Sequence, residues 1–189
     1  MKAVRRLALA LVHHPVLDRE GGVITTAITN LDMHDIARSA RTYGLEAFYV
    51  VHPVEAQREL VERLRSHWTE GGGAKRIPDR KEALALVRIV PSLDEAIGDF
   101  GGAEGPPELW TTAARARGSV EGYGALRARL ETPGPPVLLL FGTGWGLVPE
   151  LQERAAVRIA PIAGVGDWNH LSVRGACAIT LDRLLGSWA

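Results

Sequence analysis

The sequence has a single cysteine, Cys177, and therefore cannot form an internal disulfide bond. Its neighbours in "GACAIT" are mostly small or apolar, which predicts a buried structural thiol on a packed helix face. The sequence also lacks a charge excess, because 22 basic side chains balance 22 acidic ones. Proteins that depend on non-specific nucleic-acid binding usually carry a strong basic excess. The balance argues against that class and leaves room only for a local basic patch.

Long apolar runs are absent as well. No run reaches the roughly 18 to 20 residues that a membrane-spanning helix needs. The segment "MKAVRRLALALVHHP" places two arginines before a short apolar run, as signal peptides do, but it lacks a small-residue cleavage site. We therefore expect this run to form the first buried strand of a cytoplasmic protein.

The chain has 189 residues, of which 46% are apolar and 23% charged. This length and composition fit one globular domain over residues 1–189. Short apolar runs alternate with amphipathic segments, which is typical of an α/β fold with a mostly parallel sheet and helices on both faces. Asn30 or Asp32 can cap the first helix, and Gly44 ends it. The expected strands are 7–12, 46–51, 85–90, 107–115, 137–142 and 155–162, and the expected helices are 30–44, 54–73, 92–100, 119–131 and 170–188.

The stretch "VLLLFGTGWGLVPEL" (137–151) joins a buried strand to a loop with three glycines. A phosphate-binding P-loop needs a lysine and a Ser or Thr after the last glycine, and Leu147 and Val148 stand there instead. The dinucleotide pattern G-x-G-x-x-G lacks its third glycine here, although Asp167 follows at about the spacing of a ribose-binding acid. Bare backbone without a neighbouring cation suits a ligand that is not strongly anionic. S-adenosylmethionine fits better than ATP or NAD, and a simple tight turn is the alternative.

A second loop of small residues follows in "IAPIAGVGDWNHLSVRGACAITLDRLL". Asn169, His170 and Ser172 lead into the last helix, and Asn169 or Ser172 can cap it. Two such loops after neighbouring parallel strands make a pocket at the carboxyl edge of the sheet, where open α/β sheets bind ligands.

Three segments in this order resemble motifs of the SPOUT superfamily of RNA methyltransferases. They are "TTAITNLDMHDIARSARTYGLEAFYVV", "LLLFGTGWGL" and "IAPIAGVGDWNHLSVRGACAITL". The first places Arg38 at the position of the superfamily's catalytic arginine, and the third places Ser172 at the serine of its last helix. The opening of the chain looks closest to a small stand-alone bacterial group of S-adenosylmethionine-dependent RNA methyltransferases.

The resemblance implies a C-terminal trefoil knot, S-adenosylmethionine as the cofactor, an RNA substrate such as tRNA or rRNA, and a homodimer in which Arg38 of one chain completes the site of the other. It implies a cofactor site built from Thr112, Leu140, Phe141, Gly142, Thr143, Gly144, Gly146, Ile162, Gly164, Val165, Trp168, Asn169, Leu171, Ser172 and Val173.

This chain departs from the superfamily pattern at three places. The glycine loop is one residue shorter and has Gly144 where a glutamate is common. His170 stands where an asparagine usually precedes the serine, and Asp32 lies six residues before Arg38. The inference that S-adenosylmethionine is the cofactor does not depend on these positions, but the inference of which RNA atom is methylated does.

The acceptor decides which side chain carries the chemistry. For a ribose 2′-hydroxyl, Arg38 could position the oxygen and stabilise its developing charge. For a base nitrogen, Asp32, Asp35 or Asp167 could take the proton. His34, Asp35 and Arg38 can share one helix stripe, and the alternative is a solvated face in which Asp35 pairs with Arg38 or Arg41.

Candidate RNA contacts are less specific. His14 ends the first strand and could line the RNA cleft, Arg41 lies on the first helix, and Lys75 and Arg76 open the basic cluster "KRIPDRK". An ordinary solvated face explains that cluster equally well. Trp145 and Trp168 could cover the adenine or a displaced base, or could pack in the core or a dimer interface.

No spacing of histidine or cysteine suggests a metal site. Two other functions stay open: a non-catalytic accessory protein that binds S-adenosylmethionine or RNA, and a small NAD-dependent oxidoreductase.

Overall fold

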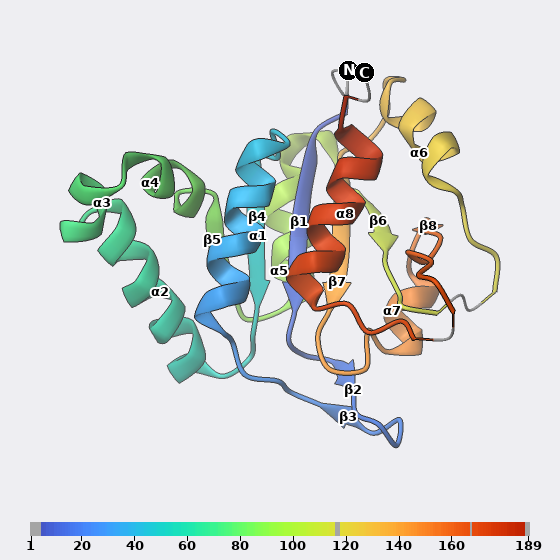
Figure 1. The fold of residues 1–189 in the computed structure, drawn as a ribbon, viewed down its shortest axis with the longest axis horizontal. Coiled ribbons are helices and arrows are strands. Elements are labelled where there is room, and N and C mark those ends of the chain that lie inside the picture. Colours follow the sequence, from blue (N-terminus) through green and yellow to red (C-terminus); the bar gives the residue numbers. More distant parts are fainter. Residues whose placement is uncertain (1–4, 116–117, 167, 188–189) are drawn as a thin grey trace.

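The computed structural model describes residues 5–115, 118–166 and 168–187. A six-stranded sheet in the order β5-β4-β1-β7-β6-β8 forms its centre, and all strand pairs in it are parallel. Figure 1 shows this sheet with β1 near its middle. Its strands are β1 (Leu7–Val12), β4 (Ala47–Val51), β5 (Val87–Val90), β6 (Glu108–Thr111), β7 (Val137–Gly142) and β8 (Val157–Arg158).

The strand order distinguishes this sheet from the NAD-binding fold. Numbered along the chain, its strands lie in the order 3-2-1-5-4-6, whereas the dinucleotide-binding fold has 3-2-1-4-5-6. The chain turns back across the sheet between β1 and β7, and ligands of open α/β sheets bind at such a switch point. The topology therefore predicts a site at the carboxyl ends of β1 and β7 and removes the structural basis for the oxidoreductase alternative.

Strict alternation along the strands divides the core into two layers. Leu7, Leu9 and Leu11 of β1 face one layer, while Ala8, Ala10 and Val12 face the other. All six residues of β1 are buried because helices cover both faces of the sheet. The α/β fold with helices on both faces is thus confirmed, and the trefoil knot stays a prediction.

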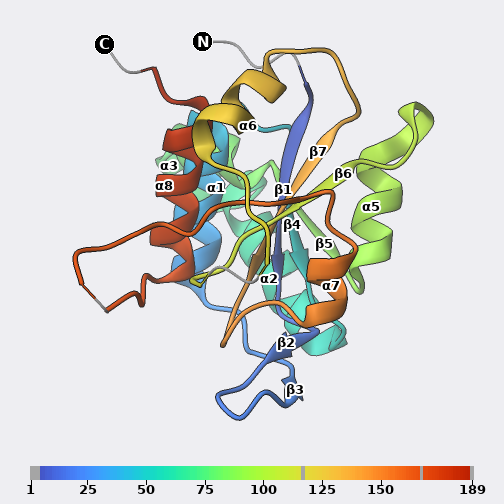
Figure 2. The same cartoon turned by 90° about the vertical axis from the view of Figure 1, so that its right-hand side faces the viewer.

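The first layer packs against five helices and the second against two, as the side view in Figure 2 shows for α1 and α8 opposite α5. The first group comprises α1 (Asn30–Thr42), α2 (Glu55–Thr69), α4 (Pro78–Leu84), α6 (Tyr123–Leu130) and α8 (Val173–Leu185), and the second comprises α5 (Leu93–Gly101) and α7 (Pro149–Glu153). Cys177 of α8 is fully buried, and burial raises the pKa of its thiol to about 12, so it is a structural residue as predicted.

Several local features differ from the sequence-based expectation. A hairpin of β2 (Val16–Leu17) and β3 (Val23–Ile24) follows β1, too short to show an alternating pattern. The helix expected over 54–73 ends at Thr69, and α3 (Gly72–Arg76) and a 3-10 turn η1 (Gly102–Glu104) are additional. Thr29 caps α1 through its hydroxyl, in place of Asn30 or Asp32, because Asn30 already lies within the helix. Gly44 ends this helix with φ +72°, and Ser172 caps α8, both as predicted.

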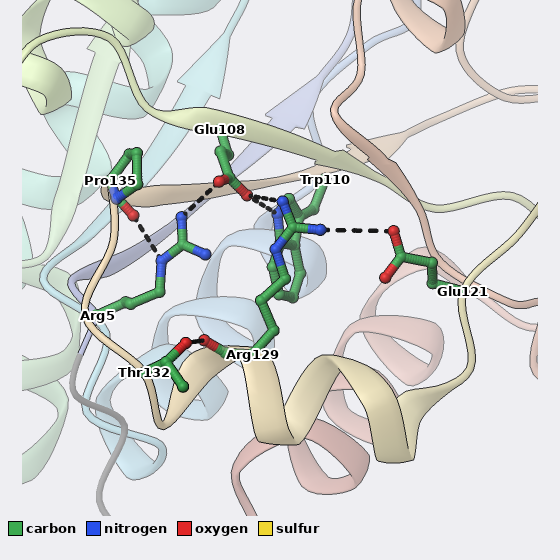
Figure 3. A network of polar contacts seen from close by, with 7 residues as sticks. All are labelled: Arg5, Glu108, Trp110, Glu121, Arg129, Thr132 and Pro135. Atoms are coloured by element: carbon green, nitrogen blue, oxygen red, sulfur yellow. Dashed lines mark hydrogen bonds and ion pairs between the residues drawn. The ribbon is translucent and has the colours of Figure 1, made fainter.

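A polar network fixes the amino end of β6, away from the carboxyl edge (Figure 3). The carboxylate of Glu108 forms ion pairs with Nη2 of Arg5 at 2.9 Å and with Nη2 of Arg129 at 2.9 Å. Its carboxylate also accepts a hydrogen bond from Nε1 of Trp110 at 3.0 Å. Nε of Arg5 donates to the carbonyl of Pro135 at 2.7 Å. One carboxylate therefore connects β6, α6 and the segments that precede β1 and β7.

Candidate functional site

A cleft of about 700 Å³ opens at the carboxyl edge of the sheet. Thr112 follows β6, Gly142 ends β7 and Ile159 follows β8, and all three line the cleft. Further walls come from the first turn of α1, the start of α8 and the hairpin after β1. The two loops singled out in the sequence thus line one cavity of a size suited to a small organic ligand.

The glycines of the first loop serve the fold of the loop itself. A Cβ on Gly142 would lie 2.7 Å from the backbone nitrogen of Leu147, and a Cβ on Gly144 would lie 2.8 Å from the carbonyl oxygen of Leu17. Gly144 and Gly146 have φ of +59° and +104°, which favour glycine. Trp145 N donates to the Leu17 carbonyl at 2.9 Å, and Leu17 N donates to the Gly146 carbonyl at 2.9 Å. The loop is therefore seated against the β2 strand.

Beneath the loop lies a chain of hydrogen bonds that begins at β1. Thr143 donates through both its backbone nitrogen and its hydroxyl to the carbonyl of Val12, at 3.2 Å each. Its hydroxyl also contacts that of Thr26, which lies 3.0 Å from Nδ1 of His13. His13 is 1% exposed; burial lowers its pKa to about 4, with a further lowering from His52 and an opposing effect of Asp32. His13 is therefore neutral at pH 7 and supports the loop from below.

The second loop is held by Asn169. Its Nδ2 donates to the carbonyl of Ala114 at 2.7 Å and to that of Ile162 at 3.1 Å. The amide thus ties the segment before α8 to the segment after β6. Ser172 then caps α8 by accepting a hydrogen bond from the backbone nitrogen of Gly175 at 3.2 Å.

A carboxylate and a guanidinium from distant segments meet at the wall of the cleft. Asp32 in the first turn of α1 accepts a hydrogen bond from the hydroxyl of Thr29 at 2.6 Å and contacts Nη1 of Arg174 at 3.1 Å. Nε of Arg174 also lies 3.6 Å from the carboxylate of Asp35. Asp32 and Arg174 line the cleft, whereas Asp35 does not. The packing of α1 beside α8 therefore brings one of the three predicted carboxylates to the site.

Most of the predicted cofactor residues come together in this cleft. The exceptions are Leu140, Gly164, Val165 and Trp168. Leu140 faces the other core layer because side chains alternate along β7, and Val165 and Trp168 are 104% and 77% exposed. The predicted residues that line it are Thr112, Phe141, Gly142, Thr143, Gly144, Gly146, Ile162, Asn169, Leu171, Ser172 and Val173.

The predicted stripe of His34, Asp35 and Arg38 on α1 lies outside the cleft of its own chain, and its catalytic role stays a prediction. Arg38 is exposed and does not line the cleft of its own chain, and its guanidinium makes no hydrogen bond or ion pair with the part of the chain that the structure describes. The suggested pairing of Asp35 with Arg38 or Arg41 is wrong. Asp35 faces Arg174, and Arg41 pairs with Glu82 at 2.7 Å. Asp167 lies outside the described residues.

The candidate RNA contacts lie apart from the cleft. Lys75 and Arg76 are exposed on α3, which packs with α2 and α4 beside the edge strand β5 (Figure 1). The cleft lies instead beside the carboxyl ends of β7 and β6. Nδ1 of His14 lies 3.0 Å from the hydroxyl of Thr25 and serves the hairpin rather than the cleft. Arg41 is held by its ion pair on the outer face of α1. Within one chain, none of the four lines the cleft.

Other lining residues were not among the predicted site residues. They come from the hairpin and the segment after it, from the segment after β6, and from α6, α7 and α8, and packing brings them to the loops. They include Leu17, Thr26, Ala27, Arg115, Tyr123, Gln152, Arg174, Ala176 and Thr180. Across residues 5–115, 118–166 and 168–187, no group of three or more His, Cys, Asp or Glu side chains is arranged to hold a metal ion.

Residues 6–186 match the model of a family described as SAM-dependent RNA methyltransferase. The chain belongs to this family. A family relative from Aquifex aeolicus, an uncharacterized protein, is 42% identical over 93% of this chain and 86% of its own length.

Two longer relatives carry a specific name. The tRNA (guanine-N(1)-)-methyltransferases of Oleidesulfovibrio alaskensis and Nitratidesulfovibrio vulgaris are 45% and 46% identical over 96% of this chain. The chain spans 42% of the length of each, about two fifths of these relatives.

Solved structures show the same fold at low sequence identity. TrmJ from Z. mobilis aligns with a TM-score of 0.62 and 19% identity, over 98% of this chain and 70% of that one. The SpoU methyltransferase AviRb from Streptomyces viridochromogenes, in complex with its cofactor AdoMet, aligns with a TM-score of 0.56 and 16% identity, over 98% of this chain and 58% of that one. The predicted SPOUT fold is therefore confirmed at the level of architecture.

The chemistry of the cleft fits the cofactor of this family. Phe141, Leu147 and Ile162 supply apolar walls, and the two loops supply backbone polar groups. The described walls contain no lysine, in contrast to a nucleotide triphosphate site. Asp32 contributes the only carboxylate among the described lining residues. The walls also contain Arg115 and Arg174, and Arg174 pairs with Asp32; the assignment of S-adenosylmethionine therefore follows from the family and from the loops rather than from the charge of the walls.

The described helices include none long and apolar enough to cross a membrane.

Proposed function

We propose that this chain transfers a methyl group from S-adenosylmethionine to RNA, and that residues 1–189 act as one SPOUT-like domain. The observation that carries the proposal is the cleft at the switch point, whose walls are the glycine loop and the segment Asn169–Val173, in a chain of an RNA methyltransferase family. Methyl transfer is an in-line displacement at a sulfonium, so the site mainly has to align the acceptor and exclude water. The rigid seating of both loops serves that purpose.

The relatives suggest tRNA as the first substrate to test, with rRNA second. Because this chain spans about two fifths of the proteins named tRNA (guanine-N(1)-)-methyltransferase, the matching part need not be the one that acts on guanine N1. The position of methylation is therefore left to the product analysis below. An RNA substrate also fits a cytoplasmic location.

Asp32 is the side chain we assign to the acceptor. It lines the cleft, and Thr29 and Arg174 hold its carboxylate in place. With a base nitrogen as acceptor, Asp32 takes the proton that leaves as the N–CH₃ bond forms and the S–CH₃ bond breaks. With a ribose hydroxyl as acceptor, Asp32 takes the hydroxyl proton, and a cation near the oxygen stabilises the charge that develops there.

That cation is Arg38 of a second copy in the homodimer that we propose. Arg38 is exposed and unpaired among the described residues, and it lies outside its own cleft. With a ribose acceptor, for which both groups act, a mixture of inactive Asp32→Asn and Arg38→Ala proteins should regain activity, because half of a mixed dimer's sites then have both groups. Light scattering should give twice the chain mass, and a monomer that is fully active would contradict this arrangement.

The deciding experiment measures methyl transfer from radiolabelled S-adenosylmethionine to total tRNA and to rRNA. Mass spectrometry of the digested product then tells a 2′-O-methylated ribose from a methylated base. Asp32→Asn should lower kcat at least 100-fold while the affinity for S-adenosylhomocysteine changes little, and Asp79→Asn on the exposed face of α4 serves as the matched control. Binding of cofactor and RNA without any transfer would favour the accessory protein over the enzyme.

A further inference from the structure

Three aromatic rings gather at the cleft where no core covers them. Trp145 comes from the glycine loop, and Trp168 and His170 come from the loop before α8. The ring of His170 lies 6.1 Å from that of Trp145 and 4.9 Å from that of Trp168, between centroids. Trp145 and His170 line the cleft, and Trp168 extends the cluster outward.

The two indole rings are exposed although they are large and mostly apolar. Trp145 is 56% exposed and Trp168 is 77% exposed, so neither packs in the core. Leu171, next to His170, adds a side chain that is 48% exposed. A contiguous exposed apolar patch of this kind marks a surface that is covered by a partner.

The backbone that carries the first ring is fixed. Trp145 donates its backbone N–H to Leu17, and Asn169, beside Trp168 and His170, is held by two carbonyls. An aromatic platform on a fixed backbone loses little entropy when a planar ligand stacks on it. Because these rings lie at the opening of the cleft, the molecule that covers them is also the one that can present an atom to the cleft.

The charges beside the patch favour a polyanion as that molecule. Arg115 lines the cleft, is exposed, and has no hydrogen-bond or ion-pair partner within the described ranges. The only carboxylate among the described lining residues, Asp32, already pairs with Arg174. A guanidinium left free beside exposed indoles suits a phosphate next to a stacked base.

We propose that Trp145, His170 and Trp168 form the platform on which the target nucleobase of the RNA stacks, with Arg115 on a neighbouring phosphate. The proposal rests on the proposed function, since the base is the one that carries, or adjoins, the methyl acceptor. Stacking on an aromatic ring tolerates every base because each has a π-face, so the platform holds the nucleotide while other groups select it.

The test uses Trp145→Ala, Trp168→Ala and the two Trp→Phe variants, with Ile77→Ala as an exposed apolar control between α3 and α4. Affinity for unfractionated tRNA is measured by fluorescence anisotropy with S-adenosylhomocysteine at saturation. Each alanine variant should bind about 5- to 100-fold more weakly, the phenylalanine variants should retain most of the affinity, and Ile77→Ala should match the wild type. Calorimetry with S-adenosylhomocysteine should give the same affinity for all five.

Three results would overturn the platform. Alanine variants that bind tRNA as the wild type does would show that no base stacks there. A loss of S-adenosylhomocysteine affinity would assign the rings to the cofactor, and a change of oligomeric mass in light scattering would assign them to a contact between copies. If the wild type methylates RNA in each of these cases, the proposed function stands without the platform. A wild type that neither binds nor methylates tRNA or rRNA would refute both.

Discussion

Acidification should destabilise the protein through His13, which lies beneath the glycine loop. Burial holds its pKa at about 4, against 6.5 for an unperturbed histidine. Below pH 6.5 the unfolded chain takes up a proton that the folded chain refuses, so the free energy of unfolding falls as the pH falls and stops falling below about pH 4. Between pH 7.5 and pH 5.0 these two pKa values give a loss of about 2 kcal/mol from this residue alone.

Urea unfolding followed by tryptophan fluorescence, at pH 7.5 and pH 5.0 and constant ionic strength, measures this loss. His34 and His52 also have lowered pKa values because of burial and contribute in the same direction. His13→Asn removes only the His13 contribution, so the variant should lose about 2 kcal/mol less than the wild type over the same interval. Equal losses in the two proteins would refute the idea that a neutral, buried His13 supports the loop.

Two further substitutions test the loop and the polar network. Gly142→Ala should destabilise the protein by about 1 to 3 kcal/mol and abolish calorimetric binding of S-adenosylhomocysteine, because its Cβ would lie 2.7 Å from the backbone nitrogen of Leu147. Gly98→Ala in α5, where a Cβ would meet no atom within 4 Å, should be neutral or stabilising. Equal effects of the two substitutions would show that the loop adapts to a side chain at Gly142. Burial alone would raise the pKa of Glu108, but hydrogen bonds from Trp110, Arg5 and Arg129 hold this pKa below its usual range. The stabilisation that the ionised Glu108 gives the folded state is therefore complete above about pH 4.5 and is lost as the pH falls further. Glu108→Gln should cost about 3 kcal/mol or more in urea unfolding at pH 7, because it leaves Arg5, whose side chain is 3% exposed, without its ion pair; an unchanged midpoint would contradict this.

Local sequence patterns were sufficient for the central elements of the fold. Continuous apolar runs predicted β1 and β7, and the alternation of such runs with amphipathic segments predicted a parallel sheet with helices on both faces. The hairpin of β2 and β3 was missed because strands of two residues have no period to detect. The same applies to α7, which has only five residues.

The candidate site was likewise predicted from the sequence only in part. The glycine loop and the segment before α8 were recognised from the sequence because their residue types are unusual at the end of a strand. For the glycines the sequence left two roles open, room for a ligand or a simple tight turn. The structure gives Gly142 and Gly144 a task in the loop itself, since a Cβ on either would strike backbone of the loop or of β2.

The sequence by itself determined which segments are strands and helices, where the loops lie at their carboxyl ends, and that one chain carries the family's three motifs in order. Those properties depend on residues close together in the chain. Only the tertiary structure decided that Arg174 meets Asp32 across 142 positions of sequence, that Arg174 rather than Arg38 or Arg41 faces Asp35, and that three aromatic rings come together at the cleft. Contacts of that kind depend on how α1 packs beside α8 and how two loops face each other, and no local pattern records such packing.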